Sequence, residues 1–313
     1  MIRTFRRRSL LASGAVLASL SLALSGCGGT TTTEDAGAGS GSAQVGEGHL
    51  QALKDKGTIT VAIAGEVPYS YEEKGEATGA TIALAKKIFG DMGIDNVETK
   101  LVDWNSLIPG LKAGRFDAVS AGMSILPDRC AEADFADPEI MYTTALMTQK
   151  DNPKGLTDLD SVKKKEDGGE DIKLAVLAGG IEAGYAKSLG LKVQSVPDAQ
   201  TGMDTVDNGR ADAFAMTAIS LTTMAKDNPD SNISVGDGFV QEIDGVKQLG
   251  AGSTVFAKGD DELRKAYNEG LAKVTDSEKS YLDVVGKFGF TAENLPPKDM
   301  TTTELCKGAP GTK

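Results

Sequence analysis

The sequence predicts an α/β protein with two lobes. Two short apolar runs, residues 58–65 (TITVAIAG) and 173–180 (KLAVLAGG), have the composition of buried strands in a parallel sheet. Two helix-to-strand segments, residues 111–119 (LKAGRFDAV) and 206–214 (VDNGRADAF), place Gly after a helix and Asp before a strand. Helical stretches separate these units in both halves, which favours two α/β lobes. The alternative is that ordinary connections between helices and strands give the same repeated pattern.

Periodicity and composition predict the remaining elements. Apolar residues at helical spacing predict a helix over residues 80–92. Residues 146–150 and 250–256 are expected to be strands at which the chain crosses between lobes. The prediction is a discontinuous lobe 1, residues 49–146 plus 252–313, and a lobe 2 of residues 147–251. Further helices are expected at residues 106–113, 182–189, 201–208, 219–226, 260–275 and 278–286, and a polar loop at residues 163–171.

The N-terminus has the pattern of a bacterial lipoprotein export signal. Arg3 and residues 6–8 (RRR) precede an apolar run over residues 10–24, which ends in Leu-Ser-Gly before Cys27. We expect a signal peptide of residues 1–26 and lipid on Cys27, with export by the general or the twin-arginine route. A free cysteine after an ordinary signal peptide is the alternative. Residues 27–48 are rich in Gly, Ala, Ser and Thr and predict a flexible tether.

Charge and histidine content exclude several classes of function. The chain carries 33 Lys+Arg against 45 Asp+Glu, so nucleic acid is not an expected partner. His49 is the only histidine and lies at the edge of the predicted tether. The globular part therefore lacks a base for a Ser-His-Asp mechanism and the ligands of an ordinary zinc site. We expect no metal, no cofactor and no catalytic residue.

The cysteines form a simple set. With Cys27 acylated, Cys130 and Cys306 remain. An even pair in an oxidising compartment favours a disulfide that ties the C-terminal tail to a segment far upstream. Two buried free thiols are the alternative.

Several motifs together resemble the extracytoplasmic solute-binding proteins of ABC importers, of the polar amino-acid type. They are residues 61–69, 104–111 (WNSLIPGL), 114–117 (GRFD) and 125–129 (ILPDR). A nearer similarity, to ectoine/hydroxyectoine-binding proteins, is carried by residues 182–186 (EAGYA), 212–218 (DAFAMTA), 288–291 (FGFT) and 304–306 (ELC), and includes the paired cysteines. The resemblance implies a periplasmic-binding-protein-like fold (type II) with two hinge crossovers and a ligand cleft between the lobes.

The resemblance also implies a set of ligand-binding residues. Arg129 would bind the ligand carboxylate, together with backbone N–H groups of the helix that Gly180 opens. Glu66 would contact the ligand's nitrogen, and Tyr69 and Trp104 would supply aromatic faces for its cation. Surface ion pairing of Arg129, a solvated Glu66 and ordinary packing of the two aromatic residues are the alternatives. The expected set is Glu66, Tyr69, Trp104, Gly122, Ser124, Arg129, Gly180 and Thr217.

Three of these positions bear on the choice of ligand. Thr217 stands where amino-acid binders present an Asp to a primary ammonium, which disfavours a standard α-amino acid. Ser124 stands where ectoine binders offer a third aromatic residue, and Gly180 where Thr is usual. The expected ligand is therefore ectoine or hydroxyectoine, with a betaine, an imino acid or another polar or cationic amino acid as the alternative.

The expected function is a monomeric, lipid-anchored receptor outside the cytoplasm that hands a small zwitterion to an ABC permease. A dehydratase-like enzyme on the same fold would have Glu66 as its lone catalytic residue. A sensory module at the membrane surface is a third hypothesis, because the fold alone does not distinguish these functions.

Overall fold

The computed structural model describes residue 46 and residues 48–308. The predicted signal peptide, Cys27 and nearly all of the predicted tether lie outside the described residues. No helix in the described part of the chain is both long and apolar enough to cross a membrane.

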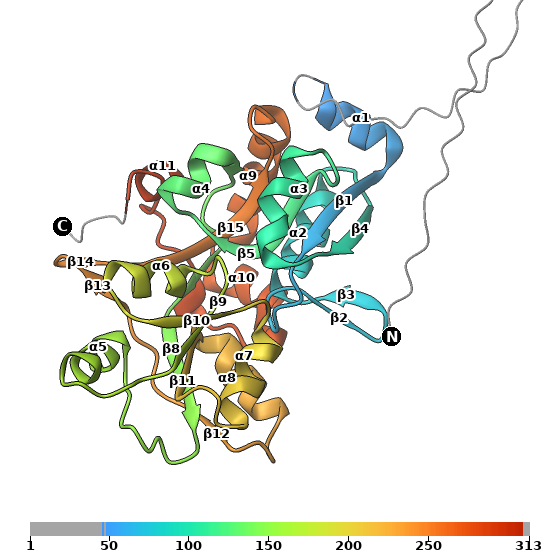
Figure 1. Ribbon diagram of the computed structural model, residues 1–313. Helices are drawn as coiled ribbons and strands as arrows, with labels where there is room; N and C mark the ends of the chain where they lie inside the picture. Colours follow the sequence, from blue (N-terminus) through green and yellow to red (C-terminus); the bar gives the residue numbers. More distant parts are fainter. Residues whose placement is uncertain (1–45, 47, 309–313) are drawn as a thin grey trace, which may run out of the picture. The chain divides into compact units, whose positions relative to one another are not determined.

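A first sheet of six strands has the order β4-β1-β5-β15-β6, with β7 pairing on β15 (Figure 1). Strand β1 runs parallel to β4 and β5, whereas β15 runs antiparallel to its neighbours. All seven residues of β15 are buried. The strands are β1 Thr58–Ile63, β4 Asn96–Leu101, β5 Ala118–Ser124, β6 Asp134–Phe135, β7 Ile140–Tyr142 and β15 Gly250–Phe256.

A second sheet of five strands has the order β10-β9-β11-β8-β12. Strand β9 runs parallel to β10 and β11, and β8 runs antiparallel to β11 and β12. In each sheet three parallel strands are therefore followed by an antiparallel strand, β15 in the first sheet and β8 in the second, with short strands beyond it. The strands are β8 Thr144–Gln149, β9 Leu174–Leu177, β10 Val193–Val196, β11 Ala213–Thr217 and β12 Ile233–Val235.

The two similar segments, residues 111–119 and 206–214, form the same local structure. Gly114 and Gly209 end their helices with φ of 63° and 73°, values that favour glycine. The next Asp in each copy then accepts a hydrogen bond from the parallel neighbour: Asp117 from the N–H of Thr60 and Asp212 from the N–H of Lys173, both at 2.8 Å. The repeat thus fixes the start of β5 on β1 and of β11 on β9.

Helices cover both faces of each sheet. On the first sheet α2, α9 and α10 pack on one face and α3 and α11 on the other. On the second sheet α5 and α6 pack on one face and α7 and α8 on the other. The helices are α1 His49–Lys56, α2 Ala80–Asp91, α3 Leu107–Lys112, α4 Pro127–Glu132, α5 Leu159–Asp167, α6 Ile181–Ser188, α7 Ala199–Asp207, α8 Ala218–Asp227, α9 Asp261–Val274, α10 Glu278–Val285 and α11 Thr302–Leu305.

Short elements complete the described chain. The hairpin β2 Tyr71–Glu73 with β3 Glu76–Thr78 follows β1, and the hairpin β13 Glu242–Ile243 with β14 Val246–Lys247 precedes β15. The single 3₁₀ turns are η1 Trp104–Ser106, η2 Gly286–Phe288 and η3 Ala292–Asn294.

The predicted polar loop at residues 163–171 is wrong. Helix α5 covers most of it and begins with a capping box between Asp158 and Ser161. Leu159 and Val162 are its buried residues, and they pack with the apolar cluster on that face of the second sheet. The charged residues of the segment lie on the rest of the helix surface, which is why the sequence resembled a loop.

His49 lies in the packed structure and not at the edge of a tether, contrary to the prediction. Its Nδ1 is 2.7 Å from Oδ2 of Asp260, and its Nε2 is 3.5 Å from Oδ1 of Asp117. The ring is only 5% exposed. The carboxylates of Asp117 and Asp260 raise the pKa of His49 to about 9.

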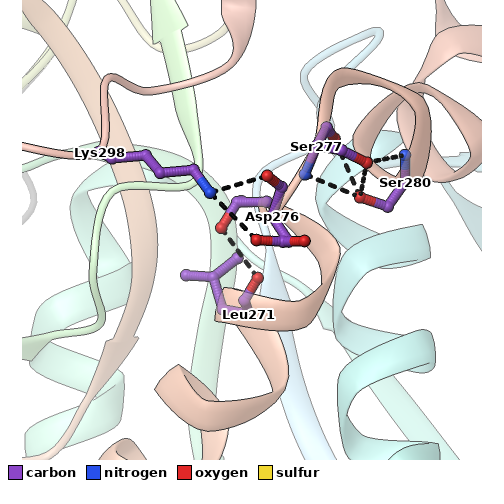
Figure 2. A network of polar contacts seen from close by, with 6 residues as sticks. Leu271, Asp276, Ser277, Ser280 and Lys298 are labelled. Carbon is purple, nitrogen blue, oxygen red and sulfur yellow. Dashed lines mark hydrogen bonds and ion pairs between the residues drawn. The ribbon is translucent and has the colours of Figure 1, made fainter.

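The C-terminal segment is attached at two places. Lys298 Nζ donates to the carbonyl oxygen of Asp276 at 2.8 Å and to its Oδ1 at 3.1 Å, beside the Ser277–Ser280 capping box of α10 (Figure 2). A disulfide joins Cys130 of α4 to Cys306, across 176 residues of sequence, with Cα atoms 5.7 Å apart. Helix α4, which carries Arg129, is thus held to the end of the described chain.

Candidate functional site

One cleft brings together most of the predicted ligand-binding residues; its empty space of about 330 Å³ includes open solvent. Seven of the eight line it, and the eighth, Arg129, lies beside it. The lining residues come from both sheets. They include residues of the loop after β1 in the first sheet and of the loop after β9 in the second. Its residues are Glu66, Tyr69, Trp104, Ala121, Gly122, Ser124, Tyr142, Leu177, Gly180, Ile181, Glu182, Met216 and Thr217.

Glu66 is a buried acid that reaches from the first sheet to the start of α8. It follows the end of β1 and is 7% exposed. Its Oε1 accepts hydrogen bonds from Ser220 Oγ at 2.7 Å and from Thr217 Oγ1 at 3.1 Å. Burial raises the pKa of Glu66 to about 7, and the two hydroxyl bonds oppose that shift. This acid is therefore not a solvated loop residue.

Tyr69 lies flat against β5 because Gly122 leaves room for it. A Cβ at residue 122 would lie 2.6 Å from Cδ1 of Tyr69, and Gly122 has φ 62°. Tyr69 is 1% exposed, yet its hydroxyl has no hydrogen-bond partner among the described residues. A buried, unpaired hydroxyl on a cavity wall is a polar contact that a ligand can complete.

Arg129 and Trp104 meet at the carbonyl of Gly179. Nη2 of Arg129 donates to Gly179 O at 2.7 Å and Nη1 donates to Ser124 O at 3.1 Å. Trp104 Nε1 donates to the same Gly179 oxygen at 3.1 Å, and the Arg129 guanidinium carbon lies 5.6 Å from the Trp104 ring centroid. Burial lowers the pKa of Arg129 from its usual value.

The nearby acids Asp128, Glu132 and Asp134, the alternative partners for Arg129, form no ion pair with it. Glu132 pairs with Lys112, and Asp134 pairs with Lys258 at 2.8 Å. The ion pairs of the described residues include none with Arg129. Its guanidinium instead faces two neutral carbonyl oxygens.

Gly179 and Gly180, the two glycines before α6, have different structural roles. At Gly179, with φ 75°, a Cβ would lie 2.4 Å from Asn105 Oδ1, so only glycine admits the close approach of η1. Gly180 is the N-cap of α6, but its own N–H donates to Leu177 O at 2.9 Å. That N–H is therefore already used within the turn. The predicted carboxylate contact concerns the N–H groups of the helix that Gly180 opens, and it stays a prediction.

Among the lining residues that the sequence reasoning missed, two carry polar side-chain groups. Tyr142, in β7, donates its hydroxyl to Ser124 Oγ at 2.5 Å and lies edge-on to Tyr69, with ring centroids 6.2 Å apart. It places a third aromatic ring in the lining, beside Ser124, the position at which ectoine binders were expected to offer one. Glu182, at the start of α6, is 3% exposed and accepts from Thr144 Oγ1 at 3.2 Å. Burial raises the pKa of Glu182 to about 7.

The cavity presents acidic, aromatic and cationic groups. Within the described residues no cluster of three or more His, Cys, Asp and Glu side chains has the arrangement of a metal site. Acidic oxygens, aromatic faces and one nearby guanidinium together suit a small molecule that carries both a cation and a carboxylate.

Several known proteins are similar to this chain in sequence. Residues 59–282 match the bacterial extracellular solute-binding proteins, family 3. A probable amino-acid ABC transporter periplasmic-binding protein, y4tE of Sinorhizobium fredii (strain NBRC 101917 / NGR234), is 31% identical over 265 residues, which cover 82% of this chain and 85% of y4tE. The arginine-binding extracellular protein ArtP of Bacillus subtilis (strain 168) is 29% identical over 230 residues, covering 72% of this chain and 83% of ArtP.

A solved structure extends the likeness. The crystal structure of EhuB in complex with hydroxyectoine has a TM-score of 0.73 and 29% identity, and the match covers 83% of this chain and 98% of EhuB. The predicted periplasmic-binding-protein-like fold (type II) and the resemblance to extracytoplasmic solute-binding proteins are both confirmed. The chain therefore belongs to the bacterial extracellular solute-binding proteins, family 3.

Proposed function

We propose that this protein is a lipid-anchored receptor that binds a small zwitterionic compatible solute, of the ectoine and hydroxyectoine class, and hands it to an ABC permease. The observation that carries the proposal is the cavity in which Glu66 and the rings of Tyr69, Trp104 and Tyr142 lie next to the guanidinium of Arg129. The likeness to EhuB, which was crystallised with hydroxyectoine, and to y4tE supports it.

Arg129 would bind the ligand carboxylate. Two of its five N–H groups donate to the neutral carbonyls of Ser124 and Gly179. A carboxylate is a better acceptor, because charge-assisted hydrogen bonds are about twice as strong as neutral ones. The cation would then lie between the aromatic rings and Glu66, where its positive charge compensates the buried acid.

We further propose that two lobes, residues 49–146 plus 252–313 and residues 147–251, close over the solute. Glu66 bonds to Thr217 and Ser220 beside the second sheet, and Arg129 and Trp104 bond to Gly179. These bonds run between the segments assigned to different lobes, so opening would break them. The ligand would stabilise the closed state by adding contacts to both sides.

A cationic amino acid such as arginine is the second candidate. A further space of about 1000 Å³, which includes open solvent, adjoins the cavity and shares Glu66 and Trp104 with it. Asp103 and Asp198 line this space, so it has the charge and room for a longer cationic side chain. The similarity to ArtP, an arginine-binding protein, is in line with this alternative.

Isothermal titration of the mature chain with ectoine, hydroxyectoine, glycine betaine, proline and arginine tests the ligand class. We expect heat with the first two and loss of that heat in Arg129→Ala. Arg115→Ala is the matched control, because Arg115 is exposed and distant from the cavity lining. Heat with arginine alone would move the assignment to cationic amino acids, and wild-type affinity in Arg129→Ala would refute the proposed position of the carboxylate.

Separate experiments test the lipid anchor and the expectation that the protein does not convert its ligand. Cys27→Ala should release the protein from the membrane fraction, whereas Cys27 in the wild type should incorporate labelled fatty acid. Ectoine recovered after long incubation with the protein should be unchanged. Product formation that is lost in Glu66→Gln would instead support a dehydratase-like enzyme.

A further inference from the structure

The cavity contains a second buried acid that the proposed function does not use. Glu66 and Glu182 are 7% and 3% exposed, and both line the same space. Neither is among the ion pairs of the described residues. Buried carboxylates are ordinarily paired with a cation, because the loss of hydration disfavours an isolated charge.

The two acids are held side by side by paired threonines. Thr217 Oγ1 donates to Oε1 of Glu66 and Thr144 Oγ1 donates to Oε1 of Glu182, at 3.1 and 3.2 Å. Thr217 and Thr144 are directly opposite each other in the antiparallel β11–β8 pair. Side chains at such positions share one face of the sheet, with Cβ atoms about 4.5–5.5 Å apart. The carboxylates are therefore neighbours although their residues are far apart in sequence.

Each acid keeps an oxygen for a ligand. The side-chain hydrogen bonds that the described residues give to Glu66 and to Glu182 all end on Oε1. Oε2 of Glu182 lies 3.5 Å from the point where residue 180 would carry a Cβ. Gly180 therefore leaves open the space beside this oxygen that a larger residue would fill.

The charges of the cavity are unbalanced without a cation. Arg129 is the nearby positive group, and its recorded hydrogen bonds go to Ser124 O and Gly179 O. The other titratable groups that interact with the two acids are Tyr69, Tyr142 and Tyr185, whose pKa values burial raises, so all three stay neutral. Burial also raises the pKa of each acid to about 7, and repulsion from Glu66 adds to the shift of Glu182.

We propose that Glu66 and Glu182 together form a two-carboxylate site for a ligand cation that carries at least two N–H donors. The inference rests on the proposed function and narrows its substrate class. An amidinium or guanidinium suits the site best, because its N–H groups diverge and can reach both Oε2 atoms while its flat face contacts the rings. Quaternary ammonium solutes such as betaines have no N–H group and are excluded.

The test compares Glu182→Gln with Glu139→Gln by titration with ectoine, whose cationic ring carries two N–H groups. Glu139 is a matched control: it is 0% exposed, its pKa is also raised to about 7 by burial, and it is outside the cavity lining. Gln at 182 keeps an oxygen for Thr144. We expect Glu182→Gln to weaken ectoine binding about 10-fold or more and Glu139→Gln to leave it within about twofold.

Proton release gives a second readout. Titrations at pH 7 in buffers of different ionisation enthalpy should show that wild type releases protons on binding, because the cation favours both carboxylates in their charged form. Glu182→Gln should release fewer. Unchanged affinity and unchanged release in Glu182→Gln would overturn the two-carboxylate site while leaving the receptor function intact.

The remaining outcomes separate the two proposals. If ectoine fails to bind and arginine binds, the ectoine class fails, and the same variants are titrated with arginine; a loss in Glu182→Gln then still supports the site. Binding of glycine betaine with wild-type affinity in Glu182→Gln would overturn the site. Failure of all five probes would overturn the proposed function and this inference together.

Discussion

Replacement of the buried histidine tests the electrostatics of the first sheet. His49 lies between Asp260 and Asp117, which raise its pKa from 6.5 to about 9. A group whose pKa is raised by folding stabilises the folded state where it is protonated in both states, below pH 6.5. That contribution falls as pH rises and is lost above about pH 9.

The size of the pKa shift sets the size of the effect on stability. At ~1.4 kcal/mol per pKa unit, the protonated ring contributes about 3 kcal/mol to the free energy of unfolding below pH 6.5. Glu66, Glu139 and Glu182 have raised pKa values as well, so they also make stability fall with rising pH, between about 4.5 and 7. The difference in unfolding free energy between wild type and His49→Gln does not contain the contribution of these carboxylates, because both proteins have them.

The assay is urea unfolding of wild type and His49→Gln at pH 6, 7, 8, 9 and 10, followed by circular dichroism. The difference in unfolding free energy should be largest at pH 6 and shrink by about 3 kcal/mol towards pH 9 to 10. A difference that stays constant over this range would refute the argument, since it would mean that His49 acts through packing and not through its charge.

Three further predictions concern the site and its support. Affinity for ectoine should rise between pH 6 and 8 as the two cavity carboxylates lose their protons, by up to about tenfold per unit for each; a flat profile would contradict their raised pKa values. Cys130→Ser with Cys306→Ser should lower the unfolding free energy by about 2–5 kcal/mol in urea titration, and an unchanged midpoint would contradict a stabilising disulfide. Gly122→Ala should weaken ligand binding through displacement of Tyr69, whereas Gly93→Ala, also at positive φ but in open space, should not.

Features that depend on neighbouring residues were predictable from the sequence. The apolar runs that became β1 and β9 and the Gly-Asp echo depend on residues a few positions apart. Predicted helices agree with the structure to within about two residues at most ends, the usual scatter of boundaries. Helix α5 was missed because its two buried apolar residues stand in a run dominated by charge.

The missed site residues depend on long-range pairing. Tyr142 reaches the cavity only because β7 pairs with β15, more than a hundred positions later in the chain. Glu182 was visible as the first acid of α6, but its role depends on Thr144, and so on β8 entering the second sheet. His49 gave no helix signal, since Gly48 provides no side-chain cap for α1.

The late position of β15 in the sequence affects how the protein folds while it is being synthesised. The strands of the second sheet all lie between residues 144 and 235, so a chain emerging N-terminus first can finish that sheet on its own. The first sheet must wait for residues 250–256, and until then β5 has an open edge that can pair with the wrong partner. Nascent chains stalled before this strand should therefore be the ones that aggregate and need a chaperone.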